Sequence, residues 1–184
     1  NISYLPYNIQ VHLVPEGHYL LGHTSAASTG KALKNIKPLL MLRDLRSVVT
    51  SYAIFNAINA GSILKETHVT SSQIENALLS HFGRNSLNVV VRSCAQAMET
   101  SLVVRYEDLM SGDRIRMADS LRALSDATEC SEETIFSAVN RAKDSQLMQF
   151  SGTAPIFEQQ WDDKLDSVFR GMDLHFLNET LGYK

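Results

Sequence analysis

The stretch Pro38-Leu39-Leu40-Met41-Leu42-Arg43-Asp44 indicates the fold class of this chain. No side chain in 38–42 contains an oxygen or nitrogen atom, and an Arg-Asp pair follows at once. A continuous apolar run of this length is typical of a strand that is buried on both faces of a parallel sheet. We therefore predict a central parallel strand at 38–42.

Outward from this stretch, the apolar pattern alternates between the period of a helix and short apolar runs. Two further strands are predicted, at 19–21 and at 101–105, and residues 9–14 form a strand or an extended segment. Gly61 ends the first strongly amphipathic helix. Helices are predicted at 24–35, 47–60, 71–82, 86–98, 114–127, 132–142 and 160–181. This order predicts an α/β fold of three layers, with a short parallel sheet flanked by helices.

Length and composition exclude several classes of protein. The chain has 184 residues, of which 44% are hydrophobic and 20% charged, as expected for one globular domain. Its net charge of −3 argues against a nucleic-acid partner. No apolar stretch is long enough to span a bilayer. Cys94 and Cys130 could form one bridge, although two half-buried thiols are the simpler interpretation. The six histidines show no metal-ligand spacing. The compartment is not indicated, with a slight preference for the cytoplasm.

Polar residues follow the predicted strands where ligands usually bind in parallel sheets. His23, Arg43 and Tyr106 each stand at a strand's carboxyl end. A guanidinium at Arg43, a helix start just after it and the Ser51 hydroxyl together suit a phosphate group. Tyr106 could stack on a purine. In the alternative interpretation, Arg43 pairs with Asp44 or another nearby carboxylate, Ser51 is a surface residue and Tyr106 only packs.

Taken together, these segments resemble the sulfotransferase family that uses 3′-phosphoadenosine 5′-phosphosulfate. Ser51 follows Arg43 by eight positions, as a serine does in the family's Arg-Asp-Pro-Arg-Asp element. The resemblance covers about residues 17 to 184 and rests on these segments: His18-Tyr19-Leu20-Leu21-Gly22-His23, Arg43-Asp44-x-Arg46, Arg105-Tyr106-Glu107-Asp108-Leu109, Trp161 and Leu181-Gly182-Tyr183.

The resemblance implies a P-loop-type sulfotransferase fold and transfer of a sulfuryl group to a hydroxyl or amine of a small molecule or glycan. It implies that His23 is the catalytic base and that Arg43 and Ser51 bind the 3′-phosphate of the donor. Tyr106 would help enclose the adenine, and Gly152 would belong to a second nucleotide-binding loop. No metal is implied.

The sequence also departs from the family pattern. Leu45 and Ser47 replace the family's Pro and Asp, and Gly152 has no basic neighbour. A Gly/Ser/Thr-rich phosphosulfate loop is missing near the N-terminus; Ser25–Lys31 lies after His23 and lacks the GxxxxGK[ST] spacing. We therefore expect residues 1–184 to be one sulfotransferase-like domain without its N-terminal strand, loop and helix, and to transfer sulfuryl groups negligibly alone. The alternative is a non-catalytic nucleotide-binding or interaction module.

Overall fold

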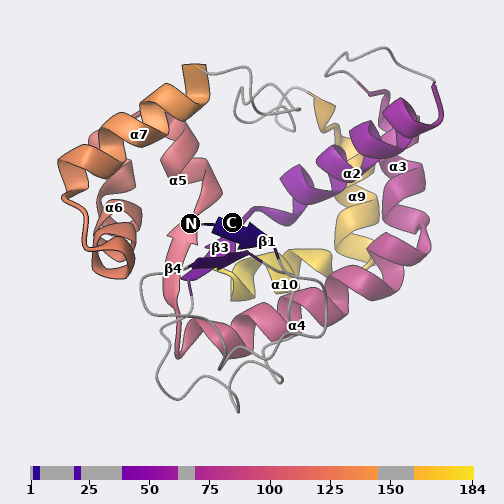
Figure 1. Cartoon of the computed structure of the whole chain (residues 1–184). Coiled ribbons are helices and arrows are strands. Elements are labelled where there is room, and N and C mark those ends of the chain that lie inside the picture. Colours follow the sequence, from indigo (N-terminus) through magenta and orange to yellow (C-terminus); the bar gives the residue numbers. More distant parts are fainter. Residues whose placement is uncertain (1, 5–18, 22–38, 62–68, 145–159) are drawn as a thin grey trace.

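The computed structural model describes residues 2–4, 19–21, 39–61, 69–144 and 160–184. This part of the chain is mostly helical, and the helices lie on both sides of a small central sheet (Figure 1). The expected α/β class, with a short parallel sheet flanked by helices, is thereby confirmed. Residues 9–14 and 24–35, for which we predicted a strand and a helix, lie outside the described residues.

The described strands form two separate two-stranded parallel sheets, and the central one pairs strands that are far apart in sequence. Strand β3 (Leu39–Leu42) runs parallel to β4 (Leu102–Arg105), with Leu40 opposite Val103 and Leu42 opposite Arg105. Strand β2 (Tyr19–Leu21) lies where it was predicted and pairs in parallel with β1 (Ile2–Tyr4), which the sequence analysis missed. The Ile-Ser-Tyr sequence of β1 is interrupted by a serine, so it lacks the short apolar run by which β2 was recognised.

The described residues contain eight α-helices and one π-helical turn. Their bounds are α2 (Leu45–Asn59), α3 (Ser71–Leu79), η2 (Phe82–Ser86), α4 (Leu87–Met98), α5 (Tyr106–Ser111), α6 (Arg114–Thr128), α7 (Glu132–Asp144), α9 (Asp163–Gly171) and α10 (Leu174–Thr180). We call α9 and α10 together the C-terminal arm. Gly61 follows the C-cap of α2 with φ +68, as expected for a helix-ending glycine.

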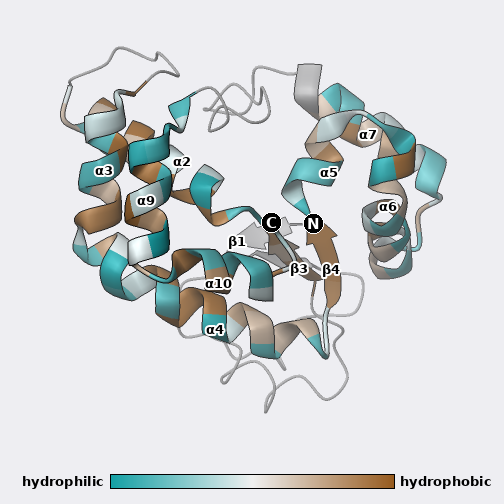
Figure 2. Cartoon of the chain, turned by 180° about the vertical axis from the view of Figure 1, so that it is seen from behind, coloured by the Kyte–Doolittle hydropathy of each residue, from teal (hydrophilic) through white to brown (hydrophobic). Residues whose placement is uncertain are grey.

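Apolar side chains of the sheet enter two separate cores. Val103 packs with helices α2, α3, α4, α9 and α10, whereas Leu102 and Val104 pack with α5, α6 and α7. Successive side chains of a strand point to opposite faces, which is why neighbouring residues of β4 reach different cores. In Figure 2 the strand lies between the group α5–α7 and the group α2, α3 and α9.

Two sequence predictions about these elements were wrong. Strand β3 is not buried on both faces, because Leu39 is 42% and Met41 55% exposed while Leu42 is buried. The single helix predicted at 160–181 is divided into α9 and α10 by Asp173, whose φ is +58. The apolar pattern continues across this break, since both helices place apolar residues in the same core.

Candidate functional site

The carboxyl ends of β3 and β4 bring two of the predicted site residues together. Arg43 follows β3 directly, and Tyr106 follows β4 as the first residue of α5. Because these strands are parallel neighbours, both residues lie at the same edge of the sheet. The Cζ atom of Arg43 lies 4.4 Å from the centroid of the Tyr106 ring, which is the geometry of a cation–π contact.

Most of the hydrogen-bonding capacity of Arg43 is unused within the described residues. Its Nε atom is 3.9 Å from Oε1 of Glu107, an ion pair that is too long for a hydrogen bond. This Nε atom is buried and has no hydrogen-bond partner, and the side chain is 33% exposed. Its terminal guanidinium nitrogens likewise make no hydrogen bond to another described residue. The alternative interpretation, in which Arg43 pairs with a nearby carboxylate, corresponds to this long ion pair with Glu107.

The two neighbouring arginines have a different role. Arg46 donates to the Asp44 carboxylate at 2.6 and 3.0 Å and to the Lys184 carbonyl at 2.6 Å. Arg105 donates to the Leu181 carbonyl at 2.8 Å, and its Cζ lies 4.9 Å from the centroid of the Tyr183 ring. Both guanidinium groups therefore hold the C-terminal segment against the strand ends.

Two backbone N–H groups at the start of α2, the helix terminus that the sequence analysis assigned to phosphate binding, already have acceptors in the chain. The N–H of Arg46 donates to Oδ1 of Asp44, the N-cap residue, at 2.8 Å. The N–H of Leu45 donates to Oδ1 of Asn178 at 2.8 Å. Asp44 and Asn178 are only 4% and 2% exposed. The negative charge of the Asp44 carboxylate would also repel an anion that approached the start of α2.

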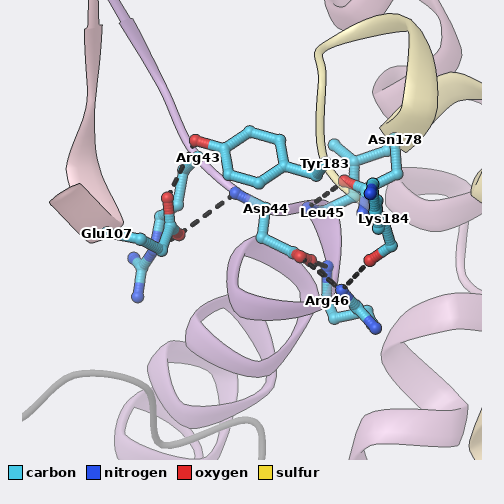
Figure 3. A network of polar contacts seen from close by, with 8 residues as sticks. All are labelled: Arg43, Asp44, Leu45, Arg46, Glu107, Asn178, Tyr183 and Lys184. Atoms are coloured by element: carbon cyan, nitrogen blue, oxygen red, sulfur yellow. Dashed lines mark hydrogen bonds and ion pairs between the residues drawn. The ribbon is translucent and has the colours of Figure 1, made fainter. Parts of the chain in front are cut away.

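Glu107 accepts hydrogen bonds from two different parts of this region (Figure 3). The sequence analysis assigned it no role of its own. Its Oε1 accepts the backbone N–H of Asp44 at 3.1 Å, and its Oε2 accepts the Tyr183 hydroxyl at 2.8 Å. Glu107 thus joins the ends of both strands to the C-terminal segment. The available signal was its place immediately after a strand end in the Tyr-Glu-Asp segment.

The environment of Tyr183 keeps its hydroxyl protonated. Burial raises the pKa of Tyr183 far above its ordinary value, and the negative charge of Glu107 raises it further. Gly182 precedes it with φ +82, and a Cβ atom there would lie 2.6 Å from Nη2 of Arg105. Glycine therefore permits both the left-handed turn and the close approach of Arg105.

The remaining predicted site residues are not joined to this group. Ser51 is partly exposed in α2 and makes no hydrogen bond to Arg43. His23 and Gly152 lie outside the described residues, so their predicted roles stay predictions. Cys94 and Cys130 are free thiols, the second of them exposed.

The described residues contain no group of three His, Cys, Asp or Glu side chains that could hold a metal ion. Within the same residues, no helix combines the length and the apolar character needed to cross a membrane. Comparison with known proteins adds no assignment, since no protein-family model, curated protein or solved structure matches the chain.

Proposed function

We propose that this chain belongs to a sulfotransferase that moves a sulfuryl group from 3′-phosphoadenosine 5′-phosphosulfate to a hydroxyl or amine. The observation behind the proposal is the state of Arg43. Of the three arginines at this edge of the described structure, Arg46 and Arg105 donate to acceptors of the chain, whereas Arg43 donates no hydrogen bond to a described residue. A partly exposed guanidinium with free donors at the end of a parallel strand suits a phosphate group.

In this proposal Arg43 binds the 3′-phosphate, the group that distinguishes this donor from ATP. Ser51 adds a hydroxyl from the helix that follows Arg43, and Gly152 comes from a second loop. Tyr106 contributes its ring to the adenine site, with Arg43 covering one face. The parallel pairing of β3 and β4, with helices on both sides, supports a P-loop-type sulfotransferase fold.

His23 is the base in the proposed reaction. The acceptor oxygen or nitrogen attacks sulfur and gives its proton to the imidazole, whose ordinary pKa near 6.5 suits this role at neutral pH. A bond from the acceptor to sulfur forms as the bond from sulfur to the bridging oxygen of the 5′-phosphate breaks. Adenosine 3′,5′-bisphosphate leaves with the electron pair of that bond.

A second candidate is a nucleotide-binding or interaction module that catalyses no reaction. The ion pair between Arg43 and Glu107 favours it, because a purely structural arginine would also lie beside a carboxylate.

Calorimetry with adenosine 3′,5′-bisphosphate and AMP tests the proposed ligand. Replacing Arg43 by Ala should weaken binding of the bisphosphate by about 1.5–3 kcal/mol and leave AMP binding almost unchanged. The matched control is Arg122→Ala, which removes an arginine that is 67% exposed on α6. An equal loss for both nucleotides would mean that Arg43 does not bind the 3′-phosphate.

Turnover separates the two candidates. If the complete protein has a donor loop, His23→Ala should lower its rate of sulfuryl transfer about 10²–10⁴-fold while nucleotide affinity stays nearly constant. Retention of more than about half of the wild-type rate would assign His23 a structural role. Nucleotide binding without any transfer to hydroxyl or amine acceptors would support the non-catalytic module.

A further inference from the structure

Both carboxylate oxygens of Glu107 are bound by uncharged donors. The Asp44 N–H donates to Oε1 at 3.1 Å and the Tyr183 hydroxyl donates to Oε2 at 2.8 Å (Figure 3). The Glu107 side chain is only 16% exposed, so these two bonds replace much of the hydration that the carboxylate has lost. Glu107 is consequently held in one place from two sides.

Glu107 forms a long ion pair with Arg43. The Nε atom of Arg43 is 3.9 Å from Oε1 of Glu107. Arg46 with Asp44 and Arg170 with Asp166 are in direct contact, at 2.6 and 2.7 Å. The pairs of Arg116 with Asp108 and of Arg122 with Asp119 are also long, at 3.6 Å, but their arginines are exposed to water, unlike the more buried pair of Arg43 and Glu107. The Arg43 Nε–H is nevertheless buried without a hydrogen-bond partner. Opposite charges that stop short of contact, beside an unused donor, indicate that something restrains one of them.

We propose that the Tyr183 hydroxyl restrains Glu107 and so prevents a direct salt bridge with Arg43, which keeps Arg43 available for an anionic ligand. Tyr183 is then a positioning residue for a binding site that it does not itself contact. This inference rests on the proposed function in one respect, namely that the anion is the 3′-phosphate of the nucleotide.

The reason is competition for the same donors. A direct salt bridge to Glu107 would occupy the Nε edge of the Arg43 guanidinium and place a negative charge beside the phosphate. Without the Tyr183 hydroxyl, Glu107 loses one of its two hydrogen bonds. Its carboxylate is then stabilised by moving closer to a cation. Arg43 is the cation that already forms an ion pair with Glu107 and whose Nε–H has no hydrogen-bond partner, whereas Arg105 is held by its bond to the Leu181 carbonyl.

Four proteins test the proposal through their affinity for adenosine 3′,5′-bisphosphate: the wild type, Tyr183→Phe, Glu107→Gln and the double variant. Tyr183→Phe should weaken binding about fivefold, the scale of a partly exposed ion pair. Glu107→Gln should bind at least as tightly as the wild type, because the competing charge is gone. The double variant should match Glu107→Gln.

The opposite ranking would overturn the proposal. Weaker binding by Glu107→Gln would mean that the carboxylate helps to orient Arg43, and Tyr183→Phe with unchanged affinity would mean that its hydroxyl is only structural. Circular dichroism and the melting temperature of each variant show whether it is folded.

A second measurement does not depend on the nucleotide. In ¹H–¹⁵N NMR spectra of the free protein, Tyr183→Phe should shift the Arg43 Nε–H signal downfield and slow its exchange with water, and the double variant should reverse both changes. Arg43→Lys assigns the signal. An unchanged signal would refute the restraint even if the bisphosphate binds. If the wild type does not bind the bisphosphate, the proposed function fails, while this spectrum still decides whether Tyr183 restrains Glu107.

Discussion

The backbone N–H of Leu45 donates a hydrogen bond to Oδ1 of Asn178, 2.8 Å away and 133 positions later in the chain. Leu45 is the first residue of α2, and Asn178 is a buried residue of α10. The bond therefore ties the C-terminal arm to the helix that follows Arg43. Proline, which stands at this position in the sulfotransferase element that the sequence resembles, could not make it because proline has no N–H.

Leu45→Pro should consequently destabilise the protein although proline is normally well tolerated at the first position of a helix. Asp44 already has an extended ψ of 130, so its backbone would accept a following proline. Because Leu45 is itself buried, the reference is Leu45→Ala, which loses the side chain but keeps the N–H. We expect the proline variant to be about 1–2 kcal/mol less stable than the alanine variant in urea unfolding.

Asn178→Ala provides the control for this comparison. With the acceptor removed, the difference between proline and alanine at position 45 should vanish or reverse. A difference that persists unchanged in the Asn178→Ala background would attribute the effect to backbone strain.

Gly83→Ala should lower the free energy of unfolding by about 3 kcal/mol. Gly83 is buried in η2, and a Cβ atom there would lie 1.9 Å from the Leu78 carbonyl oxygen. Backbone cannot rotate away as a side chain can, so the turn between α3 and α4 must move. Gly171→Ala is the matched control, since its Cβ would meet nothing within 4 Å at the end of α9. It should be neutral or stabilising by about 0.5 kcal/mol in thermal unfolding. Similar melting temperatures for both variants would contradict this prediction.

Tyr183→Phe should cost less stability at alkaline pH than at neutral pH. The pKa of Tyr183 is raised in the folded protein, first by burial and then by the charge of Glu107, so the folded state keeps a proton that the unfolded chain releases near pH 10. Its stabilising effect is complete below about pH 10 and declines as the pH rises above that value. At pH 7 the lost hydrogen bond to Glu107 should cost about 1–2 kcal/mol. If the unfolding free energies of the wild type and Tyr183→Phe change in parallel from pH 7 to above pH 10, the raised pKa of Tyr183 is refuted.

Asp162 should contribute to the loss of stability in acid. It is the N-cap of α9, and its Oδ1 accepts the N–H of Leu165 at 2.8 Å. This bond lowers the pKa of Asp162, with a further contribution from the Ser71 hydroxyl. A lowered pKa adds stability above about pH 3.9, and that stability is lost as the pH falls through the folded-state pKa.

Asp162→Asn keeps the cap and removes the titration. Its stability should fall less steeply than that of the wild type between pH 5 and 2 in chemical denaturation. Asp119→Asn, at an exposed residue of α6 without a capping role, serves as the control. Identical acid profiles for Asp162→Asn and the wild type would show that Asp162 does not contribute.

The elements of this fold were predictable wherever local patterns are strong. The run at 38–42 and the amphipathic stretch ended by Gly61 gave β3 and α2 within a few residues, because backbone propensity and apolar period act over short distances. The exposure of Met41 was not predictable, since it depends on which helices cover the sheet. Nor was the break at Asp173, where the apolar pattern runs on although the backbone turns to positive φ.

The same division applies to the candidate site. The sequence alone placed Arg43 and Tyr106 at strand ends, and the parallel pairing of β3 with β4 brought them together as expected. The sequence could not show which of the three arginines, Arg43, Arg46 or Arg105, donates no hydrogen bond to another described residue. That depended on acceptors far along the chain, because Arg46 binds the carbonyl of Lys184 and Arg105 binds that of Leu181. Residue type and spacing determine at which strand end an arginine stands. Its remaining capacity to bind a ligand depends on the acceptors that the tertiary fold places around its guanidinium group.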